Sequence, residues 1–67
     1  MGARINALGD LGNTPLHHAA SRGLEEIAQQ LLRYGADPNI KNQFGQTPLD
    51  LALIMKRRKI ADLLKRS

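Results

Sequence analysis

Residues 14–20 of the chain read TPLHHAA, and residues 47–52 read TPLDLA. The two stretches begin 33 positions apart, and shifting the whole chain by 33 positions makes 12 of the 34 aligned pairs identical. The identities fall on turn, cap and apolar residue types. Internal similarity at a fixed period of this size is the signature of a repeat architecture. The sequence therefore predicts two copies of one structural unit.

Each copy opens with residues that start a helix. Thr14 and Thr47 can cap a helix N-terminus, because a threonine hydroxyl accepts a hydrogen bond from a free backbone N–H. Pro15 and Pro48 follow at the first helical position, where a missing N–H costs nothing. Asp50 stands three residues after Thr47, where its carboxylate suits a capping box. We therefore expect two short helices that begin at the same place in each copy.

In the first copy, Gly23 ends this short helix and a second helix follows. The apolar residues of the second helix recur at the spacing of one helix face, at Leu24, Ile27, Ala28, Leu31 and Leu32. Gly35 is placed to end it in the left-handed conformation. Residues 35–46 are rich in turn formers and are predicted to form an extended turn or loose hairpin. One such unit cannot bury its own apolar face, so the units must stack.

These residues closely resemble the ankyrin repeat. Residues 14–19 carry the family's T-P-L-H-x-A signature, and the second copy carries it with Asp50 in place of the histidine. The resemblance covers essentially the whole chain. It implies an all-α repeat fold of two stacked helix-turn-helix pairs with projecting β-turn or hairpin loops. The structural motif positions that it implies are Thr14, Pro15, Leu16, His17, Gly23, Gly35, Thr47, Pro48 and Leu49.

The resemblance also implies a division of the chain. Residues 1–12 look like a leading turn from a preceding partial repeat, residues 13–45 like one repeat, and residues 46–67 like a C-terminal capping repeat. Stacks of this kind generally need about three or more repeats for stability. We therefore expect a fragment of a longer stack, a terminal piece, or a chain completed by self-association.

The function that the resemblance implies is protein–protein interaction without catalysis, through a concave surface made by the turn tips and the short first helices. Leu8 and a further set of positions map onto the family's variable residues. The set is Asp10, Leu11, Asn13, Ser21, Arg22, Lys41, Gln43, Phe44, Gln46, Ile54 and Met55. Leu11 and Phe44 occupy equivalent tip positions and are candidate anchors. His17 is expected to be structural, tying the turn through hydrogen bonds.

The two ends of the predicted stack differ in polarity. Lys56 replaces the family's glycine, and the basic residues of 56–66 give the last helix the polar outer face that a terminal repeat requires. The front of the first unit has no such cap, so pairing of exposed stack ends with another copy is an alternative function. A weaker alternative is nucleic-acid or anionic-surface binding through residues 56–66, or a targeting signal at 56–59. A solvated cap face is favoured, because no aromatic residues alternate with the basic run.

Composition argues against several other classes of protein. The chain has a net charge of +4, no cysteine, one Phe and one Tyr. The absence of cysteine excludes disulfides and fits a reducing, intracellular compartment, the cytoplasm or nucleus. His17 and His18 are adjacent and would point about 100° apart on a helix, which is a poor arrangement for one metal ion. No apolar run reaches the ~18 residues of a membrane span. We therefore expect no catalysis, no cofactor, no metal and no membrane, with another protein as the partner and nucleic acid disfavoured.

Overall fold

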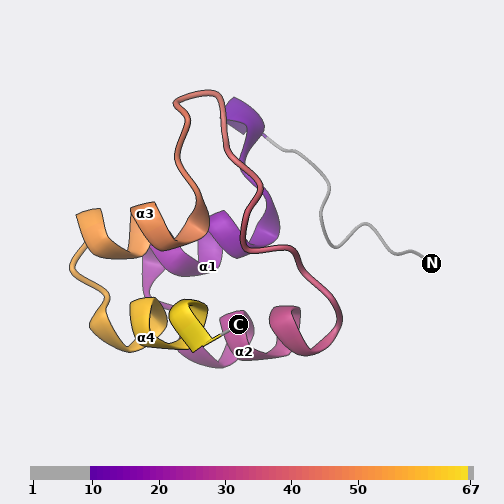
Figure 1. The fold of residues 1–67 in the computed structure, drawn as a ribbon, viewed down its shortest axis with the longest axis vertical. Helices are drawn as coiled ribbons and strands as arrows, with labels where there is room; N and C mark the ends of the chain where they lie inside the picture. The colour runs from indigo at the N-terminus through magenta and orange to yellow at the C-terminus, as the bar shows by residue number, and fades with distance from the viewer. Residues whose placement is uncertain (1–9, 67) are drawn as a thin grey trace.

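The computed structural model describes residues 10–66. A short 3-10 helix and four α-helices follow one another as η1 (Asp10–Gly12), α1 (Pro15–Arg22), α2 (Glu25–Arg33), α3 (Pro48–Ile54) and α4 (Arg58–Arg66). Helices α1 and α3 lie side by side in one layer, and α2 and α4 form the second layer (Figure 1). The α2–α3 loop rises from these layers next to η1. Within the described part of the chain there is no strand, so the all-α fold of two stacked helix pairs is confirmed.

Both first helices begin at a capping box, as the sequence predicts. The Thr14 hydroxyl accepts a hydrogen bond from the His17 backbone N–H at 3.3 Å, and the Thr14 N–H donates to His17 Nδ1 at 3.0 Å. In the second repeat, the Asp50 N–H donates to the Thr47 hydroxyl at 3.2 Å, and the Thr47 N–H donates to Asp50 Oδ2 at 3.0 Å. The capping box is therefore completed by the imidazole of His17 in the first repeat and by the carboxylate of Asp50 in the second.

Left-handed residues end the helices where the sequence predicts them. Gly23 follows α1 with φ at 75°, and Gly35 follows α2 with φ at 97°. At the end of α2 the Ala36 N–H reaches the Leu31 carbonyl at 2.9 Å, and the Gly35 N–H reaches the next carbonyl at 3.1 Å. This is the paired closure that satisfies the last carbonyls of a helix. Lys56 takes the place of Gly23 in the second repeat and also adopts a positive φ, 60°.

The core lies between the two helix pairs and is built largely from small side chains. Alanines let the helices approach closely, while a few leucines and Ile60 fill the space between the layers. The buried apolar residues are Leu16, Ala19, Ala20, Ala28, Ala36, Ala52, Ile60, Ala61 and Leu64. Leu31 and Leu32 of α2 are partly buried against this cluster.

One side of α2 stays exposed. Ile27 keeps 47% of its surface accessible and Leu24 keeps 40%, whereas Ile60, at the position equivalent to Ile27, keeps only 1%. Ile60 is covered because the second repeat packs on the first. The apolar flank that the sequence indicates at the front of the first unit is thus present. Among residues 10–66, no helix has the length and apolar character needed to cross a membrane.

Candidate protein-binding surface

The two turn tips lie against each other. The Gln43 N–H donates to the Leu11 carbonyl at 2.9 Å, and a Cβ added at Gly12 would stand 3.1 Å from the Gln43 backbone nitrogen. Gly12 therefore permits a close approach that any side chain would obstruct. Phe44 and Leu11 project from these tips with 66% and 51% of their surface accessible. Leu11 holds a left-handed φ of 62°, which is costly for a non-glycine residue.

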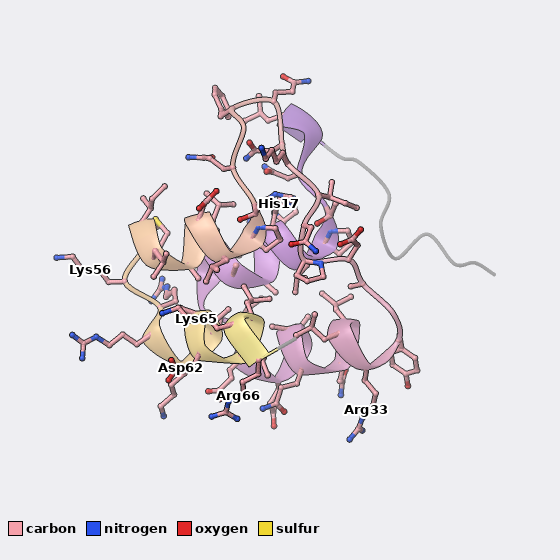
Figure 2. All side chains as sticks on the ribbon, viewed as in Figure 1. His17, Arg33, Lys56, Asp62, Lys65 and Arg66 are labelled. Carbon is pink, nitrogen blue, oxygen red and sulfur yellow. The ribbon has the colours of Figure 1, made fainter. Side chains whose placement is uncertain are left out.

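His17 fixes the second turn to the first helix. It is fully buried, and its Nε2 lies 2.8 Å from the carbonyl oxygen of Gln46 (Figure 2). Because a carbonyl only accepts, Nε2 carries the hydrogen, which leaves Nδ1 to accept from the Thr14 N–H. One imidazole thus closes the α1 cap and holds the base of the neighbouring turn.

Asn42 organises the tip of the second turn, and sequence reasoning missed it. Its Oδ1 accepts from the backbone N–H groups of Phe44 and Gln46, each at 2.9 Å. Its Nδ2 donates to Asn13 Oδ1 and to Gln46 Oε1, each at 3.0 Å. An asparagine before the turn sequence of residues 43–45 is a recognised turn former, and this signal could have identified it. The bond to Asn13 depends on the neighbouring turn and has no local signal.

The polar candidates at the turns fall into two groups. Asn13 and Gln46 are half-buried and accept hydrogen bonds from Asn42 within the turns. Lys41 and Gln43 are exposed. A role of Asn13 and Gln46 in recognising a partner stays a prediction, because their side-chain oxygens already accept hydrogen bonds within the turns. Asp10 begins η1, and Leu8 lies outside the described residues.

The remaining candidates lie at the ends of α1 and α3. Arg22 is exposed and Ser21 is half-buried, with its carbonyl 3.4 Å from the Arg57 Nε. Ile54 and Met55, the equivalent residues of the second repeat, keep 58% and 45% of their surface accessible. The end of α1 is therefore polar, and the end of α3 is apolar.

Arg57 links the second repeat to the end of α1, which sequence reasoning also missed. A Cβ added at Gly23 would stand 3.0–3.1 Å from the Arg57 side chain, so the guanidinium lies over this glycine. Its bond to the Ser21 carbonyl places a positive charge at the C-terminus of α1, where the helix dipole favours one.

The side chains at this surface offer apolar and hydrogen-bonding contacts. In the described chain, residues 10–66, no group of three or more His, Cys, Asp or Glu side chains is arranged to hold a metal ion. The turns and helix ends instead present apolar side chains on a frame held by hydrogen bonds between the repeats. Such preorganised apolar groups are what a protein interface uses as anchors.

Comparison with known proteins agrees with the fold. A family model described as ankyrin repeats (many copies) matches residues 2–52. Human oxysterol-binding protein-related protein 1 is 58% identical over 48 residues, which cover 72% of this chain and 5% of that protein. The putative E3 ubiquitin-protein ligase XBAT35 of Arabidopsis thaliana is 46% identical over 56 residues, 81% of this chain and 12% of that protein. Mouse ankyrin repeat and SOCS box protein 16 is 46% identical over 52 residues, 78% of this chain and 12% of that protein.

The chain spans only 5–12% of the length of these relatives, so the similarity concerns a short segment of each. The repeat architecture, the family match and the relatives all agree on one class. The chain belongs to the ankyrin-repeat family, whose repeats generally mediate protein–protein interaction.

Proposed function

We propose that this chain recognises another protein through a concave surface formed by Leu11 and Phe44 at the turn tips and Ile54 and Met55 at the end of α3. The observation that carries the proposal is the exposure of these four apolar side chains, between 45% and 66%. They stand at the positions where the family's variable residues map. Burying large apolar side chains contributes roughly 1.5–3 kcal/mol each when burial is complete. A partner that covered them would therefore gain substantial binding energy.

The polar residues around these anchors supply specificity. Lys41 and Gln43 lie in the same turn as Phe44, and Arg22 ends α1. All three are exposed and can hydrogen-bond with a partner, and the two basic residues can pair with its acidic groups. The frame changes little on binding, because the bonds from His17 and Asn42 already hold the second turn against the first repeat. A preorganised surface loses less conformational entropy when it binds.

Truncation of the most exposed tip anchor tests the proposal. Affinity capture on the immobilised chain would identify bound proteins, and calorimetry would then measure the affinity of each. Phe44→Ala should weaken binding by more than about 1 kcal/mol if the tip is an anchor. Tyr34→Ala is the matched control, because Tyr34 is 75% exposed at the end of α2, away from the tips and the end of α3. Equal losses from the two variants, or no loss from Phe44→Ala, would sink the proposal.

A second candidate function is self-association through the front of the first repeat. The observation that favours it is the exposure of Leu24, which precedes α2, and of Ile27 on α2, because the second repeat buries Ile60 at the position equivalent to Ile27. Sedimentation over a range of concentrations tests it: the mass of the wild-type chain should rise with concentration, and Ile27→Lys should hold it at the monomer value. Ile54→Lys, an equal change on the concave surface, should leave the association unaltered. A wild-type monomer at high concentration would exclude this function.

A further inference from the structure

The buried residues of α1 show which face of this helix the second repeat covers. Leu16, Ala19, Ala20 and Gly23 lie at i, i+3, i+4 and i+7, which places them on one side of the helix. The first three are buried, and Gly23 lies beneath the Arg57 side chain of the second repeat. This side of the first repeat is therefore the one on which the next repeat stacks.

The same side of the second repeat forms a groove between α3 and α4. Moving on by 33 residues takes Ala19, Ala20 and Gly23 to Ala52, Leu53 and Lys56. These residues, with one face of α4, line an open groove of about 650 Å³. We call this the end groove, and its lining is Ala52, Leu53, Lys56, Arg57, Arg58, Ala61, Asp62 and Lys65. It occupies the place at which a third repeat would stack.

At three positions the second repeat carries a different residue from the first, and each difference opposes the stacking of another repeat on the end groove. Ala20 is fully buried and lets α3 approach α1, whereas Leu53 at the equivalent position keeps 53% of its surface exposed and would hold a further helix away. Lys56 puts a charged side chain where Gly23 leaves room. Asp50 replaces His17, and its carboxylate has no N–H with which to hold the carbonyl of a following turn. These changes support a capping repeat, and they leave an apolar floor for a different occupant.

The charge of the end groove indicates the chemistry of that occupant. Its rim carries Lys56, Arg57, Arg58 and Lys65 against a single carboxylate, Asp62. Figure 2 shows Lys56, Asp62 and Lys65 on the α3–α4 side of the molecule and Arg33 on α2. The floor is apolar because of Leu53, which keeps 53% of its surface accessible, whereas the two alanines of the lining are buried beneath it. A ligand that matches this surface has carboxylates flanking an apolar side chain.

We propose that the end groove binds an acidic amphipathic segment of a partner protein, with an apolar side chain against Leu53 and carboxylates on Arg58 and Lys65. The end groove shares no lining residue with the proposed concave surface, so variants of each test it without changing the other, and either proposal can fail alone. A nucleic acid fits less well. It would leave the Leu53 floor exposed, would place a phosphate near Asp62, and would find no aromatic lining residue on which to stack a base.

A designed peptide tests the proposal with a defined probe. The probe is a fluorescein-labelled peptide about four helical turns long, with leucines on one face and glutamates on the other. Fluorescence anisotropy measures its dissociation constant for the full chain. Arg58→Glu and Lys65→Glu should each weaken binding about tenfold or more, and Leu53→Ala about fivefold. All three residues are exposed, and circular dichroism verifies that each variant is folded.

Two controls separate groove binding from general attraction to a basic protein. Arg33→Glu makes the same charge change on α2, outside the groove, and should alter the affinity by less than about twofold. A peptide of the same composition with its leucines scattered around the helix should bind at least about fivefold more weakly. Equal losses from Arg33→Glu and Arg58→Glu would overturn the proposal. So would equal affinity for the scattered peptide or for single-stranded DNA of the same net charge.

Discussion

His17 and Gln46 join the two repeats, because the buried Nε2 of His17 donates a hydrogen bond of 2.8 Å to the Gln46 carbonyl. At the equivalent position Asp50 caps its own helix, but its carboxylate side chain has no N–H to donate to a following turn. His17→Asp should therefore keep the α1 cap and lose the bond between repeats, while placing a carboxylate opposite a carbonyl oxygen. The expected loss is at least about 2–3 kcal/mol, measured by urea unfolding.

His18→Asp is the control for that variant. It makes the same chemical change at the next position, where the side chain is exposed, and should cost less than about 0.5 kcal/mol. An unfolded His17→Asp beside a folded His18→Asp would also agree with the prediction. Similar losses from both would mean that the bond to Gln46 contributes little.

Gly12 and Gly45 form a matched pair in the two turns. Both have φ at 74°, but a Cβ at Gly12 would meet the Gln43 nitrogen at 3.1 Å, and a Cβ at Gly45 would meet nothing within 4 Å. Gly45→Ala should cost about 1–2 kcal/mol from backbone strain alone. Gly12→Ala should cost about 1 kcal/mol or more beyond that, because the turns must separate. Thermal unfolding of both variants measures the difference, and equal midpoints would contradict the close packing of the turns.

Asn42→Ala should loosen the second turn. It removes four side-chain hydrogen bonds and leaves the Phe44 and Gln46 N–H groups without their acceptor. The expected cost is about 2–3 kcal/mol in unfolding free energy. Amide exchange at Phe44 and Gln46 should speed up at the same time. Asn39→Ala, in the exposed part of the same loop, should cost less than about 0.5 kcal/mol, and a comparable cost there would argue against a special place for Asn42.

Lys56→Gly should stabilise the chain. Lys56 holds a φ of 60°, which costs a non-glycine residue roughly 1–2 kcal/mol, and the larger backbone entropy of glycine offsets only about 0.5–1 kcal/mol of the relief. A net gain of about 0.5–1 kcal/mol is expected in urea unfolding. Lys59→Gly places the same change inside α4 and should instead lower stability by about 0.5–1 kcal/mol. If both variants lose stability, the left-handed strain at Lys56 is negligible.

The sequence was sufficient for the features that depend on neighbouring residues. Thr14 and Pro15 start α1, and Gly35 closes α2, because caps and left-handed turns involve residues only a few positions apart. The 33-residue period then predicted how the helix pairs stack. The all-α repeat fold followed from these local signals, and the family followed from the resemblance of the repeated motif to the ankyrin repeat.

Features that join distant residues could not be derived in this way. The bond from Asn42 to Asn13 and the contact of Arg57 with Ser21 each span roughly thirty residues and depend on how closely the repeats approach. The exposure of Leu53 was likewise hidden, because the helical pattern alone does not show which side of α3 lacks a neighbour. Residues that recognise a partner are harder still to predict, since their identity depends on the partner protein and not on the repeat scaffold.

The packing of α1 under α3 has a consequence for how the molecule unfolds. The buried face of α1 is covered by the second repeat, and the turn that leads into α3 is held by the His17 bond from α1. Removing either repeat would expose the apolar surface of the other. Although the architecture is modular, the chain should therefore melt as one cooperative unit, with coincident transitions when unfolding is followed by different probes.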